Sequence, residues 1–542
     1  MTKRFFPGAF LLLMFLSARP LFAQDFSIIL GRPTDSSITA SVMFRSNFQF
    51  YLAYDSVSGT GSLLTPIYSA AADIPDEVDL TGLRPDTRYY YRLYYKRPSE
   101  STYRSSDEFS FRTQRPPGSS FTFTIESDEH LYDKKGILSM YYVTLANQAA
   151  DKPDFMFSLG DIFGDDHNPD SITAYELDTL HRYYHPLLGR ICHSIPFYVC
   201  LGNHEGEKEF YLVQPPPANN MGIPATLARK KYYPNPFPNR FYSGNDSVEA
   251  NGIGQPENYY AWEWGDALFV VLDAYRDMCD TSAKPRGWAW SLGLPQYKWL
   301  KRTLENSRSK YKFVFAHHVR GEGRGGVTNA VVNEWGGYQN ANGIVGNNYT
   351  FPTHRPASQG WTKPIHQLFI DNKVSVFFQG HDHVFAHEEL DSIVYQSVPM
   401  AADSTYEIGW LANAAAYVSD TLPGTGHIRV NVSPYYVKVD FVRAYLPADT
   451  LGVRKNREVP FSYYVRAKNT FTFIGNGNWS SPDNWIDKAV PPASLPAGYF
   501  IYIDPVENGS CTLNVPQRIL PGGSLVVNPD KKFIVPSNIS IQ

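Results

Sequence analysis

The chain has 542 residues, of which 43% are hydrophobic, 19% charged and 15% aromatic. This length exceeds what one hydrophobic core usually supports, so two or three domains are expected. The composition is that of a folded protein. The formal net charge of -4 excludes the basic surface that a dedicated nucleic-acid-binding protein would carry, although a nucleotide substrate stays open.

The first residues have the pattern of a secretory signal peptide, with cleavage expected after Ala23. Lys3 and Arg4 precede an apolar stretch that ends in residues 21–23. An uncleaved anchor is less favoured, because prolines and polar residues interrupt the stretch and no later segment could span a bilayer. The protein is therefore expected to be secreted, periplasmic or on the cell surface. The cysteines are too few for a disulfide scaffold, and no pairing is assigned to Cys192, Cys200, Cys279 and Cys511.

Residues 24–116 predict a small β-sandwich. Short alternating runs such as Ile38–Phe44 and Tyr89–Tyr95 are separated by Gly, Pro and Asp turns. The segment Leu80–Leu93 contains a Leu-x-Pro-x-Thr-x-Tyr pattern and resembles the corner of fibronectin type III domains. Arg115-Pro-Pro-Gly118 is a natural boundary after this domain.

Residues 119–448 predict a layered α/β domain. Short apolar strands alternate with helical stretches such as Ile137–Ala150 and Pro295–Ser307. Each strand is followed by an Asp, Asn or His, at the end where open α/β sheets place their ligand sites. The expected strands are Phe121–Ile125, Phe155–Leu159, Phe197–Leu201, Leu268–Leu272, Phe313–Ala316 and Val374–Phe378.

Residues 468–542 return to β texture and predict a small accessory module. The segment Gly475–Trp485 contains two tryptophans among Gly, Asn and Ser. It resembles a Trp-containing repeat appended to surface proteins of Bacteroidetes-type bacteria. The resemblance makes the module a candidate for contact with the cell surface or with glycans.

Five short clusters of metal-ligating residue types follow the apolar strands of the central region. Any one cluster is weak as a signal, because short matches arise often by chance. Five in order, each after a strand, are a strong one. They are Asp128-Glu-His130, Gly160-Asp161, Gly202-Asn-His-Glu205, His317-His318 and Gly380-His-Asp-His383.

These clusters together resemble the ordered signature of the metallophosphoesterase (calcineurin-like phosphoesterase) superfamily. The resemblance implies a four-layer β-sandwich flanked by helices and two divalent transition metal ions, Zn, Mn or Fe. The bridging carboxylate would be Asp161. The implied ligands of one metal are Asp128, His130, Asp161 and His383. The implied ligands of the other are Asp161, Asn203, His317 and His381.

The resemblance also implies a mechanism, in which a hydroxide held between the metals attacks phosphorus in line with the leaving oxygen. His204 matches the family's non-ligand histidine, which contacts phosphate or protonates the leaving alkoxide. In protein-phosphatase relatives an Asp three residues after the bridging Asp orients this histidine. That position here is Gly164, so Asp165 is the hypothesised substitute.

Several residues next to the motifs are not expected to bind the metals. His318 is expected to be a bystander, although spacing alone does not decide between it and His317. Glu129 and Asp382 are expected to point away from the metals, because side chains alternate along an extended chain. Arg320 and Arg324 are equally consistent with steering phosphate and with solvating a loop. His167 and His387 are expected near the site or on the surface, and aromatic residues at 232–242 either wall a cleft or pin a loop.

A fibronectin-like domain before this core is the layout of purple acid phosphatases. The site departs from them, because their iron-binding Tyr corresponds to Gly164 and their first motif lacks the His found at His130. The favoured function is therefore hydrolysis of small phosphate monoesters by a secreted dinuclear enzyme. The alternatives are a phosphodiesterase or nucleotidase with the same site, and a cell-surface binding protein with a non-catalytic core.

Overall fold

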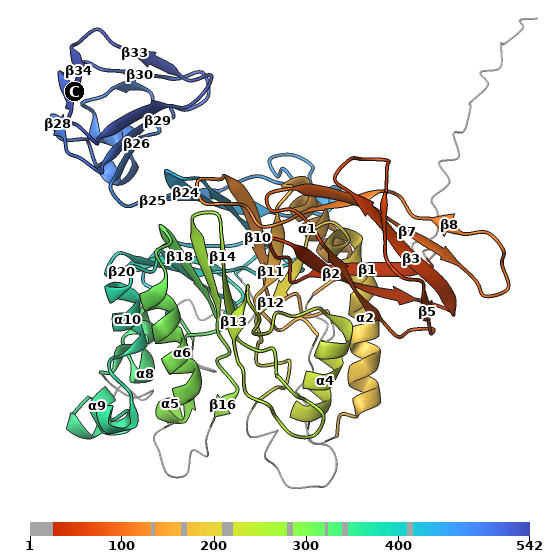
Figure 1. Ribbon diagram of the computed structural model, residues 1–542. Helices are drawn as coiled ribbons and strands as arrows, with labels where there is room; N and C mark the ends of the chain where they lie inside the picture. The colour runs from red at the N-terminus through yellow and green to blue at the C-terminus, as the bar shows by residue number, and fades with distance from the viewer. Residues whose placement is uncertain are drawn as a thin grey trace, which may run out of the picture.

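A computed structural model of the chain describes residues 25–131, 136–163, 171–208, 221–278, 286–319, 324–338, 345–408 and 416–542. An N-terminal β-sandwich, a central α/β domain and a C-terminal β module follow one another along the chain (Figure 1). None of the described helices has the length and apolar character needed to cross a membrane. The expected signal peptide lies outside the described residues.

The N-terminal sandwich packs two antiparallel sheets around an aromatic core. One sheet has the order β1 (Phe26–Gly31), β2 (Ser37–Phe44), β6 (Asp76–Thr81). The other is built on β3 (Phe48–Asp55) and β7 (Arg88–Lys96), joined by β4 (Leu63–Leu64), β5 (Tyr68–Ala70), β8 (Arg104–Ser105) and β9 (Phe109–Arg112). The Tyr89 hydroxyl accepts a hydrogen bond from the Arg84 amide at 2.9 Å, within the segment that carries the Leu-x-Pro-x-Thr-x-Tyr pattern.

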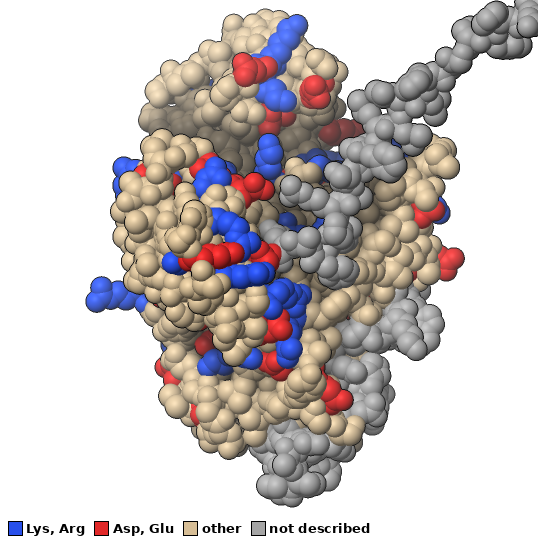
Figure 2. Space-filling view, turned by 90° about the vertical axis from the view of Figure 1, so that its right-hand side faces the viewer, with Lys and Arg blue, Asp and Glu red and all other residues tan. Residues whose placement is uncertain are grey.

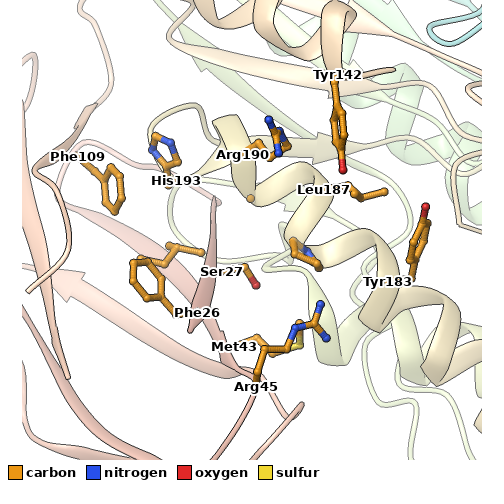
Figure 3. Close-up of a pocket in the computed structure, with 13 residues that line it drawn as sticks. Phe26, Ser27, Met43, Arg45, Phe109, Tyr142, Tyr183, Leu187, Arg190 and His193 are labelled. Atoms are coloured by element: carbon orange, nitrogen blue, oxygen red, sulfur yellow. The ribbon is translucent and has the colours of Figure 1, made fainter. Parts of the chain in front are cut away.

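The sandwich is fixed against helix α2 (Ala174–Cys192) of the central domain. His185 of this helix makes hydrogen bonds to the hydroxyls of Ser27 and Ser41 at 2.7 and 3.1 Å. A pocket remains at this seam, and Figure 3 shows Phe26 and Arg45 of the sandwich facing Leu187 and Arg190 of the helix. In this pocket the Arg190 guanidinium lies 4.1 Å from the Tyr142 ring centroid. The two buried hydrogen bonds of His185 therefore hold the two domains in one arrangement.

The central domain contains two mixed sheets. The first has the order β12 (Phe197–Val199), β11 (Phe155–Ser158), β10 (Phe121–Glu126), β23 (Gly426–Val432), β24 (Tyr436–Arg443), β25 (Phe461–Arg466). The second has the order β13 (Ser243–Gly244), β14 (Tyr260–Trp264), β15 (Ala267–Val271), β18 (Tyr311–Phe315), β19 (Val376–Gln379), β21 (Ile393–Ser397), β20 (Phe385–Leu390), β22 (Thr421–Leu422). A short hairpin, β16 (Asp277–Met278) and β17 (Trp290–Ser291), lies apart from both. Because β25 pairs with β24, this sheet continues beyond the expected domain end at residue 448.

Aromatic side chains fill the space between the two sheets. Phe157 of the first sheet stacks on Phe315 of the second, with ring centroids 4.1 Å apart and planes 16° apart. Each fully buried ring of this kind contributes roughly 1.5–3 kcal/mol through removal of apolar surface from water. The Phe side chains at alternate positions of β10 and β11 therefore join the two sheets face to face.

Helices cover the outer faces of both sheets, which completes the predicted four layers. Helices α1 (Leu138–Ala150) and α2 pack on the first sheet. Helix α2 begins at a capping box, in which Thr173 and Glu176 exchange hydrogen bonds. Helices α6 (Gly293–Asn306) and α10 (Ile365–Asp371) pack on the second sheet. The other α-helices among the described residues are α4 (Gly222–Tyr232), α5 (Arg286–Ala289), α7 (Val327–Ala330), α8 (Asn333–Gly336) and α9 (Phe351–His354).

The C-terminal module is wound as a three-sided parallel coil. Its first turn is β26 (Thr470–Phe473), β27 (Gly477–Asn478), β28 (Ser494–Leu495). The second is β29 (Phe500–Ile503), β30 (Ser510–Thr512), β31 (Gln517–Ile519), and the third is β32 (Ser524–Val527), β33 (Lys532–Ile534), β34 (Ile539–Ile541). Equivalent strands of successive turns pair in parallel. Trp479 and Trp485 are buried inside the first turn, so the tryptophans of the motif are core residues.

Candidate metal centre

The predicted site residues converge at one edge of the central domain. Strands β10, β11 and β12 run parallel to one another in the first sheet, and β18 and β19 run parallel in the second. The five clusters follow the carboxyl ends of these five strands. Parallel strands bring the residues that follow them to the same edge of a sheet, which explains why distant segments meet here.

Asp128, His130 and His383 form the first set of facing side chains, here called the Asp128 group. Their ligand-type atoms all lie within 4.8 Å of one another and all three side chains are buried. The Nε2 atoms of His130 and His383 are 2.9 Å apart, and Asp128 Oδ1 is 3.8 and 3.5 Å from them. Three donors therefore point at one small volume.

Asp161, His317 and His381 form the second set, the Asp161 group, which also meets within 4.8 Å. His317 Nε2 is 3.2 Å from both Asp161 Oδ2 and His381 Nδ1. The same nitrogen is 4.0 Å from Asp128 Oδ1, so the two groups adjoin each other. The backbone carbonyl of Leu159 lies 2.7 Å from His317 Nδ1, which leaves Nε2 directed at the carboxylates.

The residues present fit a pair of metal ions. Two imidazole nitrogens 2.9 Å apart beside a carboxylate are an arrangement that a shared cation satisfies, and oxygen with nitrogen donors suit Zn, Mn and Fe. Asp128 Oδ1 and Asn203 Oδ1 are buried and have no hydrogen-bond partner among the described residues. Buried polar atoms are otherwise almost always paired, so these two oxygens point to a ligand.

Glycines in the motifs permit the close approach of the site loops. A Cβ at Gly202 would lie 2.3 Å from Asp161 Oδ1, and one at Gly380 would lie 2.7 Å from Asp128 Oδ2. Neither distance is possible between real atoms. The glycine of the Gly-Asn-His cluster and that of the Gly-His-x-His cluster are therefore required by the packing of the two carboxylates.

The site backbone is strained. Asp128, His130, Asp161, His381 and His383 all have φ between +47° and +70°. A non-glycine residue in this left-handed region costs roughly 1–3 kcal/mol, and such residues gather at functional sites. The expectation of an extended chain through Asp128–His130 and His381–His383 is therefore wrong: the chain turns at each of these four residues, and this turn aims their side chains at the site.

The charges of the site favour a bound cation. Burial opposes ionisation of Asp161, yet the adjacent His317 and His204 imidazoles hold its pKa well below the ordinary value. For His317 burial also acts against the charged form, and the Asp161 and Asp128 carboxylates raise its pKa to about 9. Burial lowers the pKa of His381 and of His383. The carboxylates thus need positive charge beside them, while two of the imidazoles are neutral and offer lone pairs.

Glu205 is a residue whose role was not recognised in the sequence, although it ends the Gly-Asn-His-Glu cluster. Its carboxylate accepts hydrogen bonds from the amides of Asp161, Ile162 and Gly202 at 3.0, 2.8 and 2.5 Å. Burial and the charge of Asp161 raise its pKa. Glu205 therefore joins the loops that carry Asp161 and Asn203 into one unit.

His204 lies at the edge of the site with its side chain 16% exposed. Its amide donates to Asp161 Oδ1 at 2.8 Å, and its Nε2 is 3.8 Å from Asp161 Oδ2. The ring is 5.3 Å from that of His130 and almost perpendicular to it. The hypothesised partner Asp165, like Gly164 and His167, lies outside the described residues.

Asp382 is held by several hydrogen bonds beside the Asp161 group. Its carboxylate accepts hydrogen bonds from Arg324 Nη1 at 3.0 Å, from the Gly325 amide at 2.7 Å and from the Tyr417 hydroxyl. Arg324 also donates to the His381 carbonyl at 2.7 Å. Arg324 therefore holds the loop between His381 and His383 in place, while Arg320 lies outside the described residues.

The other neighbouring residues differ in how close they lie to the two groups. His318 is buried with its ring 4.8 Å from that of His381, and with His381 and Asp382 it forms a third close set. His387 packs against Tyr463 on the β20 side, with ring centroids 4.4 Å apart. Tyr232, Tyr233 and Tyr242 are buried in the core and pin their loops. The described cysteines Cys192, Cys200 and Cys511 are free.

Comparison with known proteins agrees with this geometry. Residues 121–385 match the family model of calcineurin-like phosphoesterases. By this match residues 121–385 form a calcineurin-like phosphoesterase domain, and domains of this family use divalent metal ions. No curated protein gives a significant match.

Solved structures show a similar architecture. The structure of PhoD is 16% identical, with a TM-score of 0.56 over 83% of this chain and 92% of that chain. GAP50, the anchor in the inner membrane complex of Plasmodium, is 14% identical with a TM-score of 0.33 over 64% of this chain and 89% of that one. A putative 5'-nucleotidase from Staphylococcus aureus is 11% identical with a TM-score of 0.32 over 62% of this chain and 57% of that one. The likeness to PhoD concerns the fold, and the two lower scores carry no argument.

Proposed function

We propose that the protein is a dinuclear metal-dependent phosphoesterase that hydrolyses phosphate monoesters. The observation that carries this proposal is the adjacency of the Asp128 and Asp161 groups, which His317 joins at 3.2 Å to Asp161 and 4.0 Å to Asp128. Two metal-binding sets that share an edge are what a two-metal phosphoester hydrolase requires.

Each metal would be held by residues of its own group together with Asp161. Asp128, His130 and His383 would hold one ion, and His317, His381 and Asn203 the other, with Asp161 bridging them. Two bound divalent ions supply polarisation of the phosphoester and a lowered pKa for an attacking water. The neutral amide of Asn203 adds no charge, so the second ion keeps more of its electrophilic character than a further carboxylate would leave it.

His204 would act on the substrate and not on the metals. Its partly exposed ring lies beside Asp161, at the margin of the two groups, where a phosphate oxygen or the leaving group can reach it. In its protonated form the imidazole can donate to a phosphate oxygen or to the departing alkoxide. The hydrogen bond from the His204 backbone amide to Asp161 would hold the His204 backbone in place, and Asp165 remains the proposed partner of the ring.

Export is part of the proposal and rests on the N-terminal sequence. Lys3 and Arg4, followed by an apolar stretch up to Ala23, support secretion to the periplasm, cell surface or medium. The accessory role of the C-terminal module in contact with a surface or a glycan is likewise a proposal. Export can be tested by fusing residues 1–30 to a fluorescent protein and locating the fluorescence by cell fractionation.

A phosphodiesterase or nucleotidase with the same site is the second candidate. The ligand residues do not distinguish them, because the leaving-group side of the site determines whether a second ester arm fits. Turnover of p-nitrophenyl phosphate, bis(p-nitrophenyl) phosphate and a nucleoside monophosphate should be compared on the same metal-loaded preparation. Preference for the monoester by kcat/KM supports the proposal, whereas preference for the diester overturns its specificity. A protein that binds no transition metal would favour the non-catalytic alternative.

A further inference from the structure

A basic hollow lies at the edge of the central domain where β18 and β19 begin, opposite the edge that holds the metal centre. We call it the cationic groove. The segments that precede these strands meet the end of β25 there, close to the C-terminal module (Figure 1). Its basic residues are Arg308, Lys310, Lys312, Lys373, Arg466 and Lys468.

The positive charge of the groove is only partly neutralised. Lys310 pairs with Asp266 at 2.9 Å and Arg466 with Asp487 at 3.3 Å. The described carboxylates form no ion pair with the three remaining exposed cations of the groove, Arg308, Lys373 and Lys468. The one carboxylate in the lining, Asp391, contacts His366 at 3.0 Å.

Charges of both signs lie together elsewhere on the molecule. On the face shown in Figure 2, Lys and Arg side chains lie among Asp and Glu side chains. In the N-terminal sandwich, Arg104 contacts both Asp25 and Glu100, at 2.9 and 3.0 Å. The whole chain carries a net charge of -4, so an excess of cations in one hollow is a local feature and not a consequence of composition.

Two exposed lysines, Lys373 and Lys468, line the same hollow. The charge of Lys468 lowers the pKa of Lys373. Lys373 also has a φ of +55°, directly after helix α10, where glycine is the usual residue. Two adjacent ammonium groups repel each other unless an anion lies between them. The arrangement therefore points to a negatively charged occupant.

Lys312 adds a buried charge behind this pair. Its residue is only 6% exposed, and its Nζ donates to the Leu304 carbonyl at 2.6 Å. Burial lowers its pKa, because a buried ammonium is poorly solvated. An anion in the groove would compensate that charge as well.

The shape and chemistry of the groove select among polyanions. Its volume is about 560 Å³, far more than the roughly 10–15 Å³ that one water needs. None of its described lining residues is aromatic, so it offers no surface on which nucleic-acid bases could stack. A flat bilayer surface would not fill this hollow, so an anionic membrane is a poor match for it. Ser309 and Asn372 add neutral polar groups of the kind that contact phosphate oxygens.

We propose that the cationic groove binds a linear chain of phosphate groups, at a site separate from the metal centre. Several phosphates in a row would meet several of the cations that line the groove, Arg308, Lys373 and Lys468 among them. Such a site would hold a remote part of a long phosphorylated molecule while the metal edge stays free. Binding here does not depend on whether the metal centre is catalytic.

The test uses the full-length, metal-loaded protein and long-chain inorganic polyphosphate. Orthophosphate in excess is present throughout, so that it occupies the metal centre. Binding is followed by calorimetry at several salt concentrations for the wild type and for Lys373→Gln/Lys468→Gln. Lys488→Gln/Lys532→Gln removes the same charge from the C-terminal module, and Lys373→Arg/Lys468→Arg keeps the charge in the groove.

Loss of two of the groove's cations should weaken binding about tenfold and reduce its salt dependence. The control pair and the arginine pair should bind as the wild type does, and hydrolysis of a small monoester should be unchanged in all variants. The proposal is wrong if the wild type does not bind polyphosphate, or if the control pair weakens binding equally. It is also overturned if heparin, single-stranded DNA or anionic vesicles bind the groove more tightly than polyphosphate does.

Discussion

The two edges of the same pair of sheets carry opposite chemistry. At the carboxyl edge, short Asp and His side chains are buried on strained backbone and face one another within a few ångströms. At the amino edge, long Lys and Arg side chains are mostly exposed around a hollow. The first arrangement positions ligand atoms for a particular ion, and the second produces a diffuse positive electrostatic potential.

The metal edge costs the fold free energy in the form of backbone strain. Five left-handed residues at the metal edge represent several kcal/mol of backbone strain, estimated at roughly 1–3 kcal/mol for each. The aromatic core between the sheets offsets that cost. The basic edge needs no such support, because exposed charges act at a distance and are screened by salt. Substitutions should therefore be severe at the first edge and mild at the second.

The largest effect is expected for Asp161→Asn. A neutral amide cannot offset the charge of two cations, so metal content and turnover should fall together, with turnover reduced to background. Metal analysis and a monoester assay on one preparation provide the measurement. Asp246→Asn, which removes an exposed carboxylate of the same domain, is the control and should behave as the wild type. An Asp161→Asn protein with two metals and near-normal turnover would refute the ligand assignment.

A smaller but selective effect is expected for His204→Asn. This variant should keep both metals and lose about two to four orders of magnitude in kcat, the usual size for a positioned acid or phosphate contact. His317→Asn, on the other hand, should lose metal. If His204→Asn also loses metal, His204 is a ligand and the division between the two histidines fails.

A positioning effect is expected for Asp382→Asn. The amide would weaken the contacts with Arg324 and Gly325, which hold the loop between His381 and His383. Outer contacts of this kind typically change metal affinity by about 10–100-fold. Competition with a fluorescent chelator measures the affinity, and Asp391→Asn is the matched exposed control. Unchanged metal affinity in Asp382→Asn would show that Asp382 does not position His381 and His383 for metal binding.

No visible colour is expected from the iron-loaded protein. A tyrosinate bound to iron(III) absorbs visible light, and the Asp128 group offers imidazole and carboxylate donors. Tyr275, whose ring centroid is 6.0 Å from that of His317, is the test residue for this claim. An absorption band that disappears in Tyr275→Phe would contradict it and favour a purple, iron(III)-phenolate site.

Much of the site was predictable from the sequence because each motif is local. The clusters after β10, β11, β12, β18 and β19 identify strand ends, and parallel strands must bring those ends together. The strained turns at Asp128 and His381 were not predicted, because left-handed backbone arises from packing of segments far apart in the chain. Glu205 and Tyr417 were missed for the same reason, since their partners lie on other loops.

The C-terminal module illustrates a different limit. Its β character was predicted, whereas its parallel winding was not. Equivalent strands begin at residues 470, 500 and 524, so turns of unequal length hide the repeat. The sandwich was easier to predict, because its corner motif is local. The residues that make the corner contact lie within the seven-residue segment Leu83–Tyr89.

If the two adjoining groups hold two catalytic metal ions, the metal requirement of the protein should show it. The most direct measurement is reconstitution of the chelator-treated full-length protein with Zn(II), Mn(II) or Fe(II), with bound metal and monoester turnover recorded at each addition. Turnover should be absent without metal and rise to a maximum at about two bound ions per chain, the stoichiometry of a two-metal site. Full turnover in the metal-free protein, or saturation at one bound ion, would contradict it.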